Sequence, residues 1–373
     1  MVAMMTRPPF PRAEIPTPAL VLDRAALERN IAKMAAWAAA RGIALRPHAK
    51  THKSAEVGRR QIAAGAVGLC CAKLGEAEAL AAEGLEGLHL TSPVVAPGAI
   101  KRLVALNGLS EGLSVVADHP ANVRELGAAN AGGKTLAVFV DVDPGIHRTG
   151  VASPEAAVTL AGEIAASASL KLAGVQFYCG SQQHIQSFAE RRAAIMDRTD
   201  YLRTVLDALR GAGHDISVVT GGGTGTYLID AELGVLTELQ VGSYIVLDRE
   251  YGDCELAVGD APVFEPALFV DATVISANAA GMVTVDAGLK ALSTDAGPPV
   301  VVGGAPAGSR YVFMGDEHGA IVSATGRLPG LGERVTLQPG HCDPTVNLHD
   351  VYHVLDGDMV VEVWPVTARG RSA

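Results

Sequence analysis

The chain is poor in aromatic residues and in cysteine. Aromatic side chains make up 4% of its 373 residues, whereas hydrophobic residues make up 49%, so we expect an aliphatic core. The five cysteines lack the spacing of a disulfide framework, which favours reduced thiols and a cytoplasmic location. No run of about 18 apolar residues occurs, so we expect no membrane span. Residues 1–16 lack the apolar centre of a secretion signal.

Concentrated positive charge is also missing. The formal net charge is −10, and neither sign forms a long run. Because a nucleic-acid-binding surface is typically a basic face, we expect no nucleic-acid partner. An acidic surface mainly favours solubility and indicates no particular partner.

What the chain has is a regular alternation of short apolar runs and amphipathic stretches over residues 24–255. The clearest helical stretch spans 190–209, with apolar positions three and four residues apart. Eight apolar runs predict an α/β fold with a (β/α)8, TIM-type barrel, although an open doubly wound sheet gives the same alternation. The runs are residues 43–47, 68–72, 88–91, 113–117, 136–141, 173–177, 216–219 and 238–246.

The pattern changes after about residue 260. Short segments rich in β-formers follow, separated by Gly, Pro and Asp, and they predict a C-terminal, mostly antiparallel β domain. The run at 19–23 would be a ninth barrel strand, so we assign it to the β domain. We therefore predict a barrel over residues 24–255 and a β domain formed by residues 1–23 plus 256–373. The predicted β segments are 267–276, 282–287, 311–314, 334–337 and 359–364.

A lysine follows the first predicted barrel strand. Lys50 lies where barrel enzymes place their chemistry, and burial there lowers a lysine pKa and leaves an amine that can form a Schiff base. Lys53 is interpreted as a surface residue, and Lys73, at the end of the next strand, is a rival. The flanking His48 and His52 favour Lys50.

A glycine-rich segment, residues 220–226, follows the seventh predicted strand. Glycine lets backbone N–H groups converge on an anion, and barrels usually bind phosphate after strands seven and eight. We predict phosphate contacts from Gly222, Gly223 and Thr224, and from Gly242 and Ser243 on the eighth strand. No lysine stands at Walker spacing, so this is not a nucleotide P-loop.

A lysine and a phosphate site on one barrel suggest pyridoxal 5′-phosphate (PLP). Arg148, after the fifth strand, could hydrogen-bond the phenolate oxygen of the PLP ring, and Tyr178, after the sixth, could stack on the ring. Taken singly, each is equally well a packed loop residue. A sugar-phosphate barrel enzyme without PLP is the alternative.

A His-x-Asp pair lies near the C-terminus. If the segment is extended, His341 and Asp343 share a face and could hold a divalent metal, Mn²⁺, Mg²⁺ or Co²⁺, with Zn²⁺ possible. Cys342 would point away. His184 is predicted to begin the helix after the sixth strand and to take a proton from a substrate hydroxyl. The remaining candidates, without an assigned catalytic role, are His147, His318, His349 and His353.

In this order the motifs resemble the family of D-threonine aldolases, D-3-hydroxyaspartate aldolases and D-serine dehydratases, PLP enzymes with the alanine-racemase fold. The resemblance implies that Lys50 carries PLP and that His341 and Asp343 bind metal. His-x-Asp is similar to the aldolases, whereas the dehydratases have His-x-Cys. The residues around Arg148 and Tyr178 depart from the family pattern. The matching segments are residues 17–23, 46–53, 68–73, 145–150, 220–226, 238–244, 286–290, 316–319 and 340–345.

The resemblance implies PLP- and metal-dependent retro-aldol cleavage of a small D-β-hydroxy-amino acid of the D-threonine type to glycine and an aldehyde. It implies Mn²⁺ or Mg²⁺ as the metal and a homodimer as the assembly. The alternatives are a D-serine or D-3-hydroxyaspartate dehydratase and, less favoured, an amino-acid racemase, which would need bases on both faces of Cα and no metal.

Overall fold

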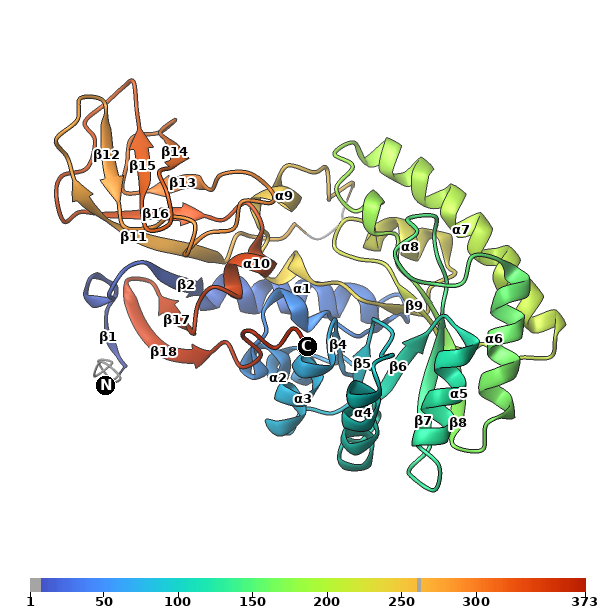
Figure 1. The fold of residues 1–373 in the computed structure, drawn as a ribbon. Coiled ribbons are helices and arrows are strands. Elements are labelled where there is room, and N and C mark those ends of the chain that lie inside the picture. Colours follow the sequence, from blue (N-terminus) through green and yellow to red (C-terminus); the bar gives the residue numbers. More distant parts are fainter. Residues whose placement is uncertain (1–7, 260–262) are drawn as a thin grey trace.

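The computed structural model describes residues 8–259 and 263–373 and contains two sheets, one mostly antiparallel at the left of Figure 1 and one parallel at the right. Residues 1–7 belong to the predicted β domain, and 260–262 lie at the predicted change of pattern. Both segments lie outside the described residues. Within the described ranges, none of the helices combines the length and apolar character that crossing a bilayer requires.

The parallel sheet is a closed barrel. Its strands follow one another in the order β3-β10-β9-β8-β7-β6-β5-β4, and each pair is parallel. A bridge between His48 and Cys70, with Cys70 N–H donating to the Pro47 carbonyl at 2.8 Å, closes the ring. The predicted barrel is confirmed, and an open sheet is excluded. The strands are β3 (Ala44–Leu45), β4 (Leu69–Cys71), β5 (Leu88–Leu90), β6 (Ser114–Ala117), β7 (Leu136–Asp141), β8 (Leu170–Phe177), β9 (Val219–Gly221) and β10 (Glu238–Leu239).

Two strands differ from their predicted positions. The eighth was expected at residues 238–246, but β10 spans only Glu238–Leu239, and Ser243–Ile245 forms a 3-10 turn. The seventh was expected at residues 216–219, but β9 begins at Val219 and runs into the glycine-rich segment. The Gly221 carbonyl accepts a hydrogen bond from Gln240 N–H at 2.8 Å, so the ladder extends through a glycine. The sequence prediction missed this because glycine is a poor strand former.

Helices cover the outside of the barrel (Figure 1). Several begin at a side-chain cap: Asp23 accepts from Ala26 N–H at 2.9 Å, and Ser153 accepts from Ala156 N–H at 3.2 Å. The helix predicted at 190–209 is observed as α7, two residues longer at each end. The helices are α1 (Arg24–Ala39), α2 (Ala55–Ala63), α3 (Leu74–Ala82), α4 (Pro97–Leu109), α5 (Pro120–Ala129), α6 (Pro154–Ala166), α7 (Phe188–Gly211), α8 (Tyr227–Leu233), α9 (Arg249–Gly252) and α10 (Cys342–Val346).

The second sheet has ten strands in the order β1-β18-β17-β2-β11-β12-β15-β14-β13-β16, with β11 also pairing with β16. Only β2 and β17 run parallel among these described pairs, so the mostly antiparallel character is confirmed. The segment at 19–23, observed as β2, joins this sheet as expected. The strands are β1 (Phe10–Pro11), β2 (Ala19–Asp23), β11 (Leu268–Ser276), β12 (Met282–Val285), β13 (Val300–Gly303), β14 (Arg310–Phe313), β15 (Gly319–Val322), β16 (Arg334–Gln338), β17 (Val351–Asp356) and β18 (Met359–Pro365).

The second sheet meets the barrel beside the turn that carries Lys50. The Tyr352 hydroxyl, on β17, donates to the His52 carbonyl at 2.5 Å, and Ala267 N–H donates to the Val246 carbonyl at 2.9 Å. Figure 1 shows α10 at this junction, between the second sheet and the barrel. The His341–Asp343 segment therefore reaches the barrel mouth.

Candidate active site

A cavity of about 220 Å³ opens where several barrel strands end. In (β/α)8 barrels the strand carboxyl ends form the functional face, so this is the expected position for chemistry. The cavity is lined by His48, Lys50, Ala72, Thr91, Ser92, Arg148, Gln176, Tyr178 and Gln240. Three predicted site residues, Lys50, Arg148 and Tyr178, thus share one cavity.

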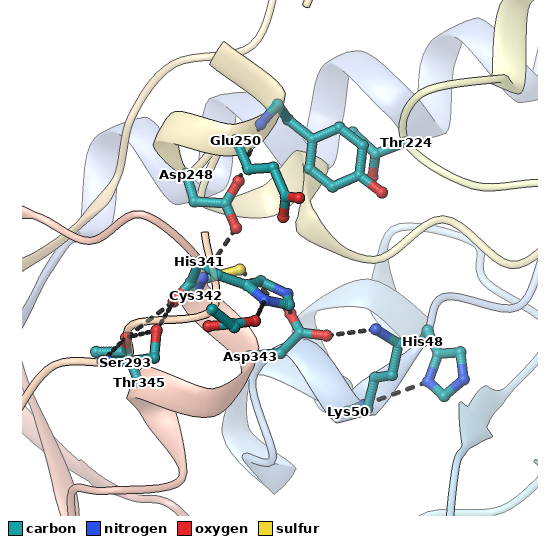
Figure 2. Close-up of polar contacts among 12 residues, drawn as sticks. His48, Lys50, Thr224, Asp248, Glu250, Ser293, His341, Cys342, Asp343 and Thr345 are labelled. Atoms are coloured by element: carbon teal, nitrogen blue, oxygen red, sulfur yellow. Dashed lines mark hydrogen bonds and ion pairs between the residues drawn. The ribbon is translucent and has the colours of Figure 1, made fainter. Parts of the chain in front are cut away.

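Lys50 lies in a 3-10 turn, residues Ala49–Thr51, which begins four residues after the end of β3. Its Nζ contacts the Asp343 carboxylate, 293 positions away in the sequence (Figure 2). Burial alone would lower the pKa of Lys50, but the charge of Asp343, its hydrogen bond to Lys50 and the nearby Tyr178 together raise it. The sequence prediction of a lowered pKa is therefore wrong for this arrangement, because it considered burial without the opposite charge.

His341 and Asp343 lie at the start of a helix and not in an extended segment. His341 is the residue that precedes α10, and Asp343 is in its first turn. The two residues were expected to share a face if the segment is extended; that condition is not met, although His341 Nε2 still lies 3.8 Å from Asp343 Oδ1. Helix geometry brings them together because the residue before a helix and the first turn share one end. The side chain of Cys342, the residue between them in the sequence, is buried.

Three acidic residues that the sequence analysis missed surround this pair. Asp295 Oδ2 lies 2.5 Å from His341 Nδ1, and Asp248 Oδ2 accepts from Cys342 N–H at 2.9 Å. Figure 2 shows the Asp248 and Glu250 carboxylates near the His341 imidazole. Asp248 and Glu250 follow the last barrel strand, so their position at a strand end was an available signal. Asp295 lies in a β-domain loop and offered none.

The charges around the pair shift its pKa values. Burial alone would lower the pKa of His341, but Asp343 and Asp295 raise it. Burial alone would raise the pKa of Asp343, but Lys50 and His341 hold it below its usual range. The carboxylate of Asp343 is therefore kept ionised, as a cation ligand must be.

His184 lies in the turn before α7 and not at the start of that helix, which begins at Phe188. The prediction placed it within the helix because the amphipathic pattern gives no sharp boundary. Its Nε2 is buried without a hydrogen-bond partner among the described residues and lies 3.6 Å from Glu250 Oε2. Burial lowers the pKa of His184, so its ring is neutral and can accept a proton.

The glycine-rich loop is held by a side chain that the sequence analysis did not consider. Gln183 Oε1 accepts from Gly225 N–H at 3.1 Å, and its Nε2 donates to Thr226 Oγ1 at 3.0 Å. A Cβ at Gly225 would lie 2.0 Å from the Gln183 backbone oxygen, so only glycine permits this approach. Gly223 N–H itself donates to Thr226 Oγ1 at 3.2 Å, which leaves it less suited to an anion than predicted.

The second half of the predicted phosphate site lies beside the lysine turn. A Cβ at Gly242 would lie 2.6 Å from Thr51 Oγ1, and that hydroxyl is buried without a hydrogen-bond partner in the described part of the chain. Thr224 Oγ1 accepts from Tyr244 N–H at 3.0 Å, which leaves its own O–H free to donate. Ser243, also predicted, begins a buried 3-10 turn. Thr51 is an anion donor that sequence reasoning missed.

Arg148 and Tyr178 face each other across the cavity wall. The Arg148 Cζ lies 5.6 Å from the centre of the Tyr178 ring, a cation–π distance. The loop before Arg148 is fixed by Asp143, whose Oδ1 accepts from Gly145 N–H at 2.8 Å and whose Oδ2 lies 2.8 Å from His147 Nδ1. His147 therefore braces the loop that presents Arg148.

Several other candidate lysines and histidines lie away from this cavity. Lys53 was interpreted as a surface residue, and this is wrong: it is buried and pairs with Glu76, because the segment after β3 turns inward. Lys73, the rival of Lys50, is exposed. His349 and His353 line a separate cavity of about 440 Å³ beside β2 and β17, and His318 is exposed between β14 and β15.

These residues fit both predicted groups. A phosphate would meet the Thr51 hydroxyl, which has no hydrogen-bond partner among the described residues and which lies close to the backbone of Gly242. For the metal, ligand distances are about 2.1 Å, so one ion could touch both His341 Nε2 and Asp343 Oδ1, which are 3.8 Å apart. Among the described residues no three His, Cys, Asp or Glu side chains are arranged to hold a metal by themselves, so water or substrate would complete the coordination.

Comparisons with known proteins show the family to which the chain belongs. A family model described as "Alanine racemase, N-terminal domain" matches residues 22–250, and one described as "Putative serine dehydratase domain" matches residues 267–355. A 3-hydroxy-D-aspartate aldolase from Paracoccus denitrificans (strain Pd 1222) is 40% identical over 369 residues, which cover 98% of this chain and 95% of that protein. The chain belongs to this family of alanine-racemase-fold proteins.

Further members of the family extend the likeness. A D-threonine aldolase from Arthrobacter sp is 39% identical over 369 residues, which cover 98% of this chain and 96% of that protein. The crystal structure of D-threonine aldolase from Filomicrobium marinum covers 99% of each chain with a TM-score of 0.94 and 39% identity. The family resemblance and the fold that the sequence predicted are thereby confirmed.

Proposed function

We propose that the protein is a carbon–carbon lyase that cleaves a D-β-hydroxy-amino acid of the D-threonine type to glycine and an aldehyde, with PLP and a divalent metal. The observation that supports this most is the contact of Lys50 with Asp343 at the mouth of the barrel. One amine and one candidate metal ligand, from opposite ends of the chain, face the same space. The names of the related aldolases support the reaction type.

Lys50 would carry PLP, and Tyr178 and Arg148 would lie against the ring and its oxygen. The hydroxyls of Thr224 and Thr51 would donate to the phosphate, together with the N–H groups of the sequence-predicted Gly222, Gly223, Gly242 and Ser243. PLP, when bound, delocalises the negative charge that develops at the substrate Cα. Because Gly242 has no Cβ, the Thr51 hydroxyl can lie close to its backbone, where both groups would face the phosphate.

His341 and Asp343 would hold the divalent metal, with Mn²⁺ or Mg²⁺ favoured and Zn²⁺ or Co²⁺ as alternatives. Such a cation, when bound, acts as a Lewis acid that lowers the pKa of a hydroxyl group. Imidazole nitrogen and carboxylate oxygen suit these cations. Asp343 is suited to the role because its carboxylate stays ionised.

His184 is proposed as the base that takes the proton of the substrate β-hydroxyl. Its lowered pKa keeps the ring neutral, and its buried Nε2 has no partner of its own among the described residues. The Glu250 carboxylate, 3.6 Å away, would stabilise the ring once it is protonated. Loss of the hydroxyl proton drives cleavage of the Cα–Cβ bond and release of the aldehyde.

We further propose a cytoplasmic homodimer with a barrel over residues 24–255 and a β domain of residues 1–23 plus 256–373. The free state of all five cysteines supports the location, and the pairing of β2 with β11 and β17 supports the division. The family resemblance supports the dimer, as do exposed aliphatic side chains at β13 and β14. They are Val300, Val302, Val312 and Met314. A particle mass of one subunit in light scattering would contradict the dimer.

The test is glycine formation from D-threonine by the purified protein with PLP and Mn²⁺. We expect EDTA to abolish glycine formation and added Mn²⁺ to restore it. Lys50→Ala should lose both glycine formation and cofactor absorbance, whereas the matched control Lys73→Ala, at the exposed end of the next strand, should keep both. Production of a 2-oxo acid and ammonia would identify a dehydratase. Full activity in Lys50→Ala would refute the proposal.

A further inference from the structure

We propose that Asp295 is a positioning residue that sets which nitrogen of His341 faces the metal. The proposal rests on the metal site proposed above. Asp295 Oδ2 lies 2.5 Å from His341 Nδ1, and the other ring nitrogen, Nε2, lies 3.8 Å from Asp343 Oδ1. The imidazole is thus held between two carboxylates, one on each nitrogen.

The chemistry of the two partners fixes the hydrogen. An ionised carboxylate can only accept hydrogen bonds, so Nδ1 must carry the hydrogen that it donates to Asp295. The neutral ring then has its lone pair on Nε2, on the side of Asp343. A carboxylate on the far nitrogen also makes an imidazole a stronger ligand. Without Asp295 the hydrogen could sit on either nitrogen, and one of the two tautomers could not bind a cation at Nε2.

The backbone around Asp295 is fastened to the segment that carries His341. The Ser293 hydroxyl donates to the His341 carbonyl at 3.1 Å and lies 2.9 Å from Thr345 Oγ1 (Figure 2). Arg249 holds the same loop by donating to the Ala296 carbonyl. The Asp295 carboxylate is therefore placed by the loop as well as by its own hydrogen bond.

A surface ion pair is the simpler interpretation of this contact. The Asp295 side chain is 52% exposed, and exposed ion pairs contribute little to stability. The two interpretations differ in whether the Asp295–His341 ion pair affects the affinity for the metal. A surface pair can be deleted without changing metal affinity, whereas loss of a positioning carboxylate typically weakens metal binding about 10- to 100-fold.

The experiment measures Mn²⁺ affinity of the PLP-loaded protein by electron paramagnetic resonance, in which free Mn²⁺ gives the signal. We expect the Kd for Mn²⁺ to rise about tenfold in Asp295→Ala, the low end of the range because the carboxylate is half exposed. Asp295→Asn, which keeps an acceptor oxygen without the charge, should fall between Asp295→Ala and wild type. The absorbance of bound PLP should not change in either variant.

Asp350→Ala is the matched control, because Asp350, the residue before β17, forms an exposed ion pair with Arg369. It should bind Mn²⁺ like wild type. An unchanged Kd in Asp295→Ala would overturn this inference while leaving the proposed reaction intact, provided that wild type binds Mn²⁺ and forms glycine. Failure of wild type itself to bind Mn²⁺ would overturn both. A rise in Kd for Asp350→Ala equal to that for Asp295→Ala would also refute a specific role, since the effect would then be one of general surface charge.

Discussion

Asp230 should make the stability of this protein fall as pH rises from the acid side to neutrality. Its carboxylate is buried under the glycine-rich loop, where Oδ2 accepts from Thr226 Oγ1 at 2.6 Å, and a Cβ at Gly222, whose φ is +67°, would collide with it. Burial raises the pKa of Asp230 from 3.8 to about 7. The folded protein therefore holds a proton there over a range in which the unfolded chain has released it.

The direction in which stability changes with pH follows from this difference in proton binding between the folded and unfolded chain. A raised folded pKa gives a stabilisation that is fully present below pH 3.8 and is lost as pH rises through about 7. Between about pH 5 and pH 8 the lost free energy of unfolding is roughly 2–3 kcal/mol, at about 1.4 kcal/mol per pKa unit. With an unfolding entropy of about 2 cal/mol/K per residue, this corresponds to a change in Tm of about 3 °C.

The assay compares wild type with Asp230→Asn, which has nearly the same shape and no charge to release. The Tm of wild type should fall about 3 °C further than that of the variant between about pH 5 and pH 8. Asp207→Asn, at an exposed position on α7, is the control and should follow wild type. If the Tm difference between wild type and Asp230→Asn does not change with pH, the buried carboxyl does not titrate as argued.

Three further perturbations test other parts of the structure. Gly242→Ala adds a Cβ 2.6 Å from Thr51 Oγ1, so the Kd for PLP in an absorbance titration should rise about tenfold, and an unchanged Kd would remove Gly242 from the phosphate site. Lys53→Met leaves the buried carboxylate of Glu76 without its ion pair, so stability in a melting experiment should fall by about 3–5 kcal/mol; a Tm equal to wild type would contradict this. Asp343→Ala removes a charge that raises the Lys50 pKa. Because PLP loading needs the neutral amine, loading should extend to lower pH than in wild type, and an identical pH profile would argue against the coupling of Lys50 with Asp343.

The barrel could be predicted because each of its strands and helices requires a pattern of apolar residues that can be recognised within one short segment of the sequence. A parallel strand covered on both faces needs a short aliphatic run, and its helix needs an apolar stripe. Val138 and Val140 on β7, for example, are fully buried. Strands of the second sheet were harder to predict. β13, β15 and β17 were missed because loops rich in glycine, proline and charged residues surround them.

Site residues whose positions depend on a single segment could also be predicted from the sequence. Lys50 and the cavity residues Arg148 and Tyr178 follow strands, so their strand-end positions could be inferred. The helical state of Cys342–Val346 was missed, although Pro344 near the beginning of a helix is a known signal. Thr51 and Asp295 could not be found, because their roles depend on neighbours from other segments.

The sequence by itself determined which side chains follow which strands, and with them the barrel, the lysine and the His-x-Asp pair. Only the tertiary structure decided which charged side chains lie next to the His-x-Asp pair. Lys50 and Asp343 stand 293 positions apart, and their contact reverses the pKa shift that burial alone would give the lysine. The reason is that an electrostatic interaction depends on separation and on the local dielectric, and both are set by how the chain closes in space.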